Sequence, residues 1–185
     1  MRSICVFCGS KPGANDGYMQ VASRVGTLLA QRGATVVYGG GRVGLMGALA
    51  EAALAANGRV IGVIPQMLID REVGHSNLSE LHVVRTMAER KEMMGALSTA
   101  FLTLPGGTGT MDELFEAWTW TQLGLQRKPS GLLNFAGYYD PLIAFLDRAV
   151  GEGFLEPRHR AALWVDDNAS RLIERLCAFP DDAAG

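Results

Sequence analysis

The sequence predicts an α/β fold in which a Rossmann-like, doubly wound parallel sheet carries helices on both faces. Short apolar runs that suit buried strands alternate with longer helical runs along the whole chain. Two of these runs are followed at once by glycine clusters that open a helix, at residues 39–47 and 105–110. The 185 residues, 48% of them hydrophobic, are enough to bury one substantial core. We therefore expect a single Rossmann-like domain at residues 1–179 and a frayed tail at 180–185.

The expected strands are short apolar runs, several of them rich in β-branched residues. The run before the second glycine cluster is apolar and partly β-branched, as a strand buried on both faces of a parallel sheet should be. In chain order the strands are expected at residues 3–7, 34–38, 60–64, 81–85, 100–104, 131–134 and 163–165.

The expected helices lie between these strands, at residues 16–32, 45–56, 88–98, 111–125, 139–151 and 169–179. In the fourth helix, Leu114, Trp118 and Leu123 recur at helical spacing. Gly33 is expected to cap the first helix, because helices commonly end at a glycine. Residues 66–80 are polar and are interpreted as a loop that follows the carboxyl end of a strand. Ligand sites of α/β proteins form at such ends, so this loop is a candidate lid or substrate wall.

Charge and hydropathy exclude several classes of protein. The net charge of -2 and the pI near 5.9 argue against non-specific nucleic-acid binding, which requires a basic face. No apolar run reaches the roughly 20 residues that span a bilayer, and the amino terminus does not resemble a signal peptide. We therefore expect a cytoplasmic protein with neither a nucleic-acid nor a membrane partner.

The cysteines and histidines do not predict a metal site. Cys5 and Cys8 form a C-x-x-C pair, which is compatible with redox chemistry or with half of a zinc site. Cys5 lies within an apolar strand run, however, and no second ligand pair follows at zinc-site spacing, so buried strand cysteine is favoured. The three histidines are too scattered along the chain for ligation, and no metal or other cofactor is expected.

The run from Pro105 to Glu113 is typical of a phosphate site. A buried strand would deliver its glycines to the carboxyl edge of the sheet, just before a helix begins. The free N–H groups of a helix N-terminus and the helix dipole both favour a phosphate there, and side chains in place of the glycines would block its approach. Glu113 follows one turn later as a candidate catalytic carboxylate. On the turn alone, an acid matched to the helix dipole is the favoured explanation of Glu113.

The other glycine cluster fits the G-x-G-x-x-G template at Gly39, Gly41 and Gly44. In a dinucleotide site, an acidic residue at the end of the next strand would bind a ribose hydroxyl. The next strand here ends in Pro65 and Gln66 instead. The cluster is therefore interpreted as a mononucleotide site and not as an NAD site.

Four strand ends should converge on one edge, at residues 7–10, 39–47, 66–80 and 105–110. Near them, Arg90 and Lys91 stand at the start of an expected helix, where cations oppose the dipole and call for an anion. A phosphate or Glu113 would supply that anion. Composition alone favours a solvated charge cluster at residues 89–92.

Together these motifs resemble the LOG (Lonely Guy) family of cytokinin-activating phosphoribohydrolases. The likeness runs from residues 7–10 through the pattern P-G-G-x-G-T-x-x-E to Tyr138 and Tyr139, so it covers nearly the whole chain. Sequences with this pattern have often been labelled lysine decarboxylases. The resemblance implies hydrolysis of the N-glycosidic bond of cytokinin riboside 5'-monophosphates or AMP. The products would be the free base and ribose 5-phosphate, and the partner a small nucleoside monophosphate.

The resemblance also implies the functional residues. Arg90 and Glu113 would be catalytic, and Ala88 departs from the family, because many members have histidine there. The family forms dimers, and helices bearing Met93, Leu97 and Trp118 are candidates for that interface, together with Leu123. Substrate would be bound by Gly9, Ser10, Gly40, Gly41, Glu72, Arg90, Lys91, Gly106, Gly107, Thr108, Gly109, Thr110, Glu113 and Thr119.

The chemistry of the residues agrees with this activity. Loss of the base leaves an oxocarbenium-like sugar, which a carboxylate such as Glu113 can stabilise while it orients or deprotonates water. Arg90 would either orient Glu113 or bind the ribose and phosphate, and the sequence does not separate these roles. A nucleotide-binding module without catalysis remains an alternative. A pyridoxal phosphate-dependent decarboxylase is a weaker one, since its Schiff base would have to form on Lys11, Lys91 or Lys128.

Overall fold

One parallel sheet organises the chain. The computed structural model describes residues 2–72, 75 and 77–180, apart from the side chains of residues 70–72. Within this part, seven strands pair in the order β4-β3-β2-β1-β5-β6-β7, and each neighbouring pair is parallel. The predicted doubly wound α/β fold is confirmed. The predicted tail lies, from residue 181 onward, outside the described residues.

The strands match the predicted ranges to within a residue or two. They are β1 Ser3–Phe7, β2 Thr35–Tyr38, β3 Val60–Pro65, β4 Glu80–Val84, β5 Ala100–Thr103, β6 Ser130–Leu133 and β7 Leu163–Asp166.

All six predicted helices are present, namely α1 Asp16–Gln31, α2 Gly44–Ala55, α4 Met87–Ala96, α5 Thr108–Gln122, α6 Asp140–Gly151 and α8 Ala169–Ala178. Gly33 follows α1 with a φ of +65°, and its N–H donates to the carbonyl of Ala30, as a terminating glycine should.

Three short elements were not predicted: α3 Gln66–Glu72, the 3-10 turn η1 Phe135–Gly137 and α7 Pro157–Ala162. The interpretation of residues 66–80 as a loop is therefore wrong for the first half of that segment. Each of these elements is too short to show an amphipathic period, which needs a window of about eleven residues or more.

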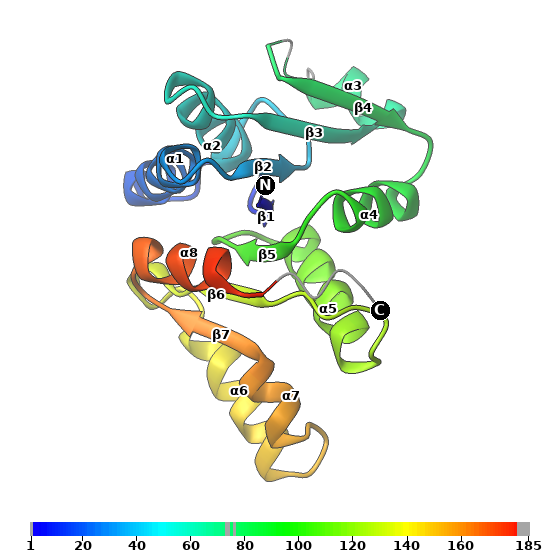
Figure 1. Ribbon diagram of the computed structural model, residues 1–185. Helices are drawn as coiled ribbons and strands as arrows, with labels where there is room; N and C mark the ends of the chain where they lie inside the picture. The colour runs from blue at the N-terminus through cyan, green and yellow to red at the C-terminus, as the bar shows by residue number, and fades with distance from the viewer. Residues whose placement is uncertain (1, 73–74, 76, 181–185) are drawn as a thin grey trace.

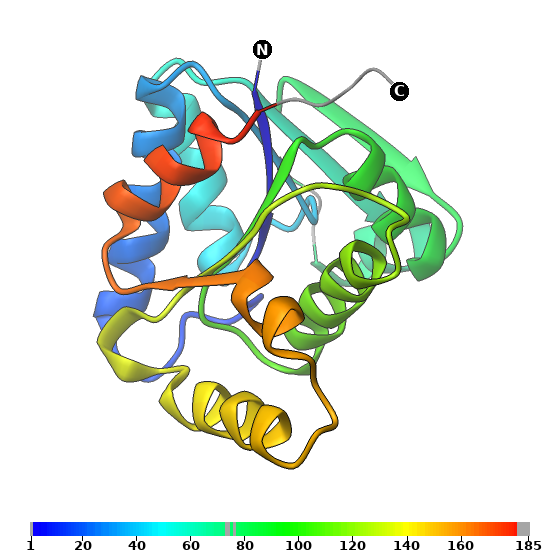
Figure 2. The same ribbon diagram turned by 60° about the horizontal axis from the view of Figure 1, so that its bottom comes forward.

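Helices cover both faces of the sheet (Figures 1 and 2). α1, α2 and α8 pack on one face, and α4 and α5 lie on the other. β1 is central, so its alternate side chains enter both cores, with Ile4 and Val6 on one face and Cys5 and Phe7 on the other. Cys5 and Cys8 are buried free thiols, as the strand interpretation predicted. None of the described helices is long and apolar enough to cross a membrane.

The strand order changes direction at β1. From there β2, β3 and β4 are added on one side, whereas β5, β6 and β7 lie on the other. Such a switch point separates the turns that leave adjacent strands and opens a crevice at their carboxyl ends. The turn after β5 is tied to the turn after β1, because Gly9 N–H donates to the carbonyl of Pro105 over 3.1 Å.

Candidate active site

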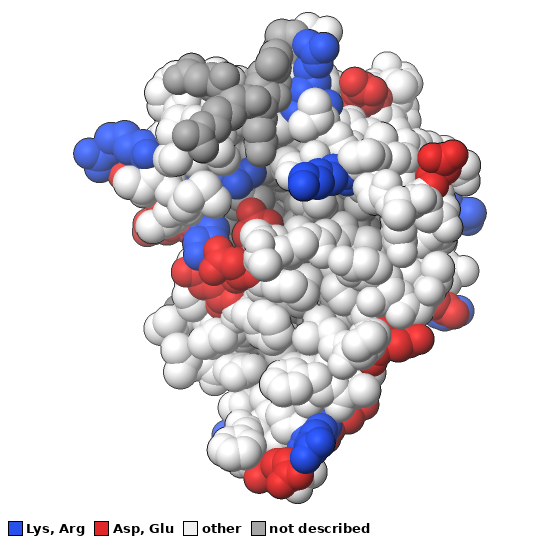
Figure 3. Space-filling model, turned by 180° about the vertical axis from the view of Figure 1, so that it is seen from behind, with Lys and Arg blue, Asp and Glu red and all other residues white. Residues whose placement is uncertain are grey.

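A cavity of about 520 Å³ lies at this switch point. Figure 3 shows a face on which basic and acidic side chains lie beside the grey atoms, with a largely uncharged surface in the middle and further charged side chains at the right and lower edges. The cavity is lined by the turns after β1 and β5, the end of β2, the first turns of α2, α4 and α5, and two tyrosines. Its residues are Val6, Cys8, Gly9, Ser10, Lys11, Gly13, Tyr18, Gly39, Leu45, Met46, Arg90, Pro105, Gly106, Gly107, Thr108, Gly109, Thr110, Glu113 and Tyr138.

The N-terminus of α5 opens into the cavity. Gly107 is the residue before the helix, and no side chain caps it. A methyl group on Gly107 or Gly109 would meet no protein atom within 4 Å, so that space is open to a ligand. Gly106 differs, since a Cβ there would come within 2.1 Å of Thr110 Oγ1 and 2.9 Å of Gly9 N. Glycine is thus required by packing at position 106, and it leaves room for a ligand at 107 and 109.

Glu113 lies one turn into α5 with only 10% of its side chain exposed. Burial raises its pKa to about 7, because a carboxylate is poorly solvated there, and the Arg90 charge opposes that rise without cancelling it. Near neutral pH the group therefore exists in both forms. This is the range in which a general acid or base works best.

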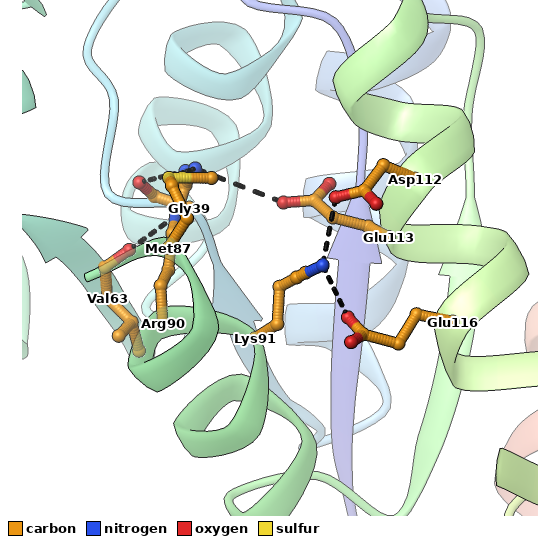
Figure 4. Close-up of polar contacts among 8 residues, drawn as sticks. All are labelled: Gly39, Val63, Met87, Arg90, Lys91, Asp112, Glu113 and Glu116. Atoms are coloured by element: carbon orange, nitrogen blue, oxygen red, sulfur yellow. Dashed lines mark hydrogen bonds and ion pairs between the residues drawn. The ribbon is translucent and has the colours of Figure 1, made fainter.

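Arg90 is held by backbone carbonyls at the ends of two strands (Figure 4). Its Nε donates to the carbonyl of Val63 over 3.0 Å, and Nη2 donates to that of Gly39 over 2.7 Å. Nη1 lies 4.0 Å from Glu113 Oε1. A Cβ on Gly39 would come within 1.9 Å of Arg90 Nη2, so any other residue there would displace the guanidinium. The solvated-cluster interpretation is wrong for Arg90, whose guanidinium is buried at the cavity.

Lys91 points away from the cavity toward α5 (Figure 4). Its ammonium pairs with Asp112 Oδ2 at 3.0 Å and with Glu116 Oε2 at 2.6 Å. The sequence indicated that the two cations at the start of α4 need an anion nearby. Asp112 and Glu116 are the anions beside Lys91, and Glu113 is the anion nearest Arg90. Lys91 therefore links α4 to α5 beside the site.

The structure brings together most of the predicted substrate-binding residues. The cavity is lined by Gly9, Ser10, Arg90, Gly106, Gly107, Thr108, Gly109, Thr110 and Glu113. Gly40, Gly41, Lys91 and Thr119 do not line it. A Cβ on Gly40 would face Ile64 and Leu81, away from the cavity, and Gly39 is the lining residue of that turn. Thr119 is exposed almost two turns beyond Glu113. Glu72 ends α3, but its side chain lies outside the described residues.

The sequence interpretation missed Lys11, Tyr18 and Tyr138 as lining residues. Tyr138 lies just beyond the end of β6, which neighbours β5, so its place at a strand end was a usable signal. Tyr18 comes from the first turn of α1 and carried no such signal. Among residues 2–72, 75 and 77–180, no three His, Cys, Asp or Glu side chains are grouped as metal ligands would be.

Comparison with known proteins agrees with this geometry. The family described as "Possible lysine decarboxylase" matches residues 46–176. The probable cytokinin riboside 5'-monophosphate phosphoribohydrolase LOGL5 of Oryza sativa subsp. japonica is 46% identical over 98% of this chain and 75% of its own length. The phosphoribohydrolase LOG7 of Arabidopsis thaliana is 45% identical over 95% of this chain and 81% of its own length. The chain belongs to the LOG family.

Solved structures share this LOG-family fold at much lower identity. The X-ray structure of TM1055 superposes with a TM-score of 0.73 at 20% identity, covering 97% of this chain and all of that one. The molybdenum cofactor carrier protein of Chlamydomonas reinhardtii gives 0.73 at 20% identity, covering 96% of this chain and 99% of its own. Likeness at this level concerns the fold alone.

Proposed function

We propose that this LOG-family protein hydrolyses the N-glycosidic bond of cytokinin riboside 5'-monophosphates or AMP, releasing the free base and ribose 5-phosphate. Its curated relatives carry the name of this activity at 45–46% identity over nearly the whole chain. The observation that carries the proposal is the position of Glu113, a buried carboxylate one turn from a glycine-lined helix N-terminus in the same cavity.

The N–H groups from Gly107 to Thr110 would hold the 5'-phosphate, aided by the helix dipole. Binding at the phosphate, remote from the reacting carbon, fixes the ribose so that C1' faces Glu113. As the bond from C1' to the base breaks, its electron pair leaves with the base, which takes up a proton from solvent, while Glu113 later returns to solvent the proton that it receives from the attacking water. Water adds its oxygen to C1' and gives a proton to Glu113, whose negative charge stabilises the oxocarbenium-like sugar.

Arg90 would act mainly on Glu113 and on the shape of the cavity. Two of its nitrogens are bonded to the carbonyls of Gly39 and Val63, and Nη1, which donates to Met87 Sδ over 3.8 Å, is the nitrogen that lies 4.0 Å from Glu113. Direct binding by Gly40, Gly41, Lys91, Glu72 and Thr119 stays a prediction from the family resemblance.

A homodimer in the cytoplasm is part of the proposal. Leu123 and Leu125, just beyond α5, are 68% and 72% exposed and would suit an interface. Met93 and Leu97 on α4 are half-buried against the core on that side. Trp118 would offer little surface to this interface, because it is buried within the chain and its indole N–H donates to the carbonyl of His159. Equilibrium sedimentation with Leu123→Glu, which should give monomers, tests this assignment.

The activity is tested by incubating the protein separately with AMP and with isopentenyladenosine 5'-monophosphate and measuring free base by chromatography. Release by the wild type and its loss in Glu113→Gln would support the proposal and rank the two substrates. Measurable nucleotide binding without release of base from either would assign the protein to the non-catalytic nucleotide-binding modules.

A further inference from the structure

The turn after β5 is fixed through three successive carbonyl groups. The hydroxyl of Tyr139 donates to the carbonyl of Leu104 over 2.7 Å. The N–H of Gly9 donates to that of Pro105 over 3.1 Å. The hydroxyl of Tyr138 donates to that of Gly106 over 2.7 Å. Each peptide unit on the way into α5 is therefore held from outside, two of them by adjacent tyrosines.

The last of these bonds sets the direction of a donor. The carbonyl of Gly106 and the N–H of Gly107 belong to one peptide unit, which is planar and trans, so the two groups point in opposite directions. Both flanking residues are glycines, and glycine permits backbone dihedrals that other residues cannot adopt. Without an anchor, this peptide is free to flip, which would turn the Gly106 oxygen to where the Gly107 N–H points. An oxygen there repels a phosphate.

Tyr138 reaches Gly106 from a connection that is itself rigidly shaped. Ala136 and Gly137 both have a positive φ, of +53° and +71°, and the side chain of Asn134 accepts from the N–H of Tyr139 over 2.8 Å. The Tyr138 ring makes edge contacts with Tyr18 and Tyr139, at centroid distances of 5.7 and 4.8 Å. These contacts hold the ring beside Gly106, where its hydroxyl makes the bond to the carbonyl.

We propose that Tyr138 is a positioning residue for the substrate phosphate, whose hydroxyl locks the Gly106–Gly107 peptide with the Gly107 N–H available as a donor. The assignment of this phosphate to a nucleotide rests on the proposed function. Tyr138 acts through the backbone and takes no part in the chemistry at C1'. Its loss therefore weakens substrate and transition state equally, which raises KM and leaves kcat nearly unchanged.

The test compares Tyr138→Phe, which keeps the ring and removes only the hydroxyl, with the wild type. Loss of one hydrogen bond is expected to weaken inorganic phosphate binding, measured by calorimetry, about three- to tenfold. KM for AMP should rise by the same factor, with kcat within about twofold. Tyr38→Phe is the matched control, because the Tyr38 hydroxyl is buried without a hydrogen-bond partner and its residue does not line the cavity. It should keep wild-type phosphate affinity.

The two measurements separate this proposal from the proposed function. If the wild type binds phosphate but releases no base from AMP, the proposed function fails, and the calorimetry still tests Tyr138. Equal phosphate affinity in Tyr138→Phe and the wild type would overturn the positioning role. A fall in kcat at unchanged phosphate affinity, or no phosphate binding by the wild type, would overturn it as well. Thermal unfolding of each variant shows whether the fold is retained.

Discussion

Arg90 Nη1 and Glu113 Oε1 lie 4.0 Å apart, although both side chains are at most 10% exposed. The shorter bonds of the guanidinium go to the carbonyls of Val63 and Gly39, so the arginine is fixed by the sheet. A close, bidentate pair would have kept Glu113 ionised at all neutral pH values. At the observed separation, the effect of burial on Glu113 outweighs that of the Arg90 charge, and burial raises the pKa of Glu113 to about 7.

The rate of base release should rise with pH through about 7, because the mechanism requires Glu113 as a carboxylate. The check is kcat/KM for AMP between pH 5 and pH 9. Glu113→Gln should lose both the activity and this dependence. A profile that is flat across this range in the wild type would contradict the assigned role.

Stability should show the opposite dependence on pH. The pKa of Glu113 is raised in the folded state, so the folded protein holds a proton that the unfolded chain releases above about pH 4.5. The group therefore favours the folded state at low pH, and this contribution disappears as pH rises through 7. Relative to the wild type, Glu113→Gln should become more stable between pH 4.5 and pH 8, by at most about 3 kcal/mol. Urea unfolding at both pH values measures the difference, and an unchanged difference would show that Glu113 has an ordinary pKa.

Arg90→Lys should damage stability and activity together. A lysine ammonium cannot reach both carbonyls in the fork geometry of a guanidinium, so one buried acceptor loses its partner, at a cost of about 1 to 3 kcal/mol. Displacement of the charge beside Glu113 should lower kcat roughly 100-fold. Denaturant unfolding and steady-state kinetics measure the two effects.

Lys91→Met is the control for Arg90→Lys. It removes the partly exposed pairs with Asp112 and Glu116, each worth about 1 kcal/mol or less. Its kcat should stay near that of the wild type, since Lys91 does not line the cavity. An equal loss of kcat in Arg90→Lys and Lys91→Met would mean that the positive charge at the start of α4 matters and that the two-carbonyl geometry of the Arg90 guanidinium does not.

Gly109→Ala should increase stability while it weakens substrate binding. Position 109 lies within α5, where alanine is favoured over glycine by about 0.5 to 1 kcal/mol, and the added methyl meets no protein atom within 4 Å. The same methyl enters the space assigned to the phosphate. The melting temperature should rise and the affinity for inorganic phosphate should fall. Full phosphate affinity in this variant would place the anion elsewhere.

Local sequence signals predicted the sheet, and most of the residues that the sequence indicated for the site lie together at one cavity. The turn after β5, which the sequence indicated as a phosphate site because a strand, glycines and a helix follow one another, lines the cavity. In the turn after β2, the family resemblance implied Gly40 and Gly41 as binding residues, whereas Gly39 lines the cavity. Spacing does not report which way a glycine backbone turns. The bond from Tyr138 to Gly106 joins distant positions and depends on how β6 sits beside β5, which no local pattern encodes.

The hydrogen bond from Gly9 to Pro105 joins two segments that are far apart in the sequence, so the ribosome synthesises the first long before the second. During synthesis, the amino-terminal strands β1 to β4 emerge well before the turn that completes the cavity. A nucleotide therefore has nothing to bind until β5 has docked beside β1, and it cannot stabilise the earlier intermediates. Ligand binding stabilises only the folded state that contains the site. Nucleotide in the cell should thus protect the finished protein without assisting the first half of its folding.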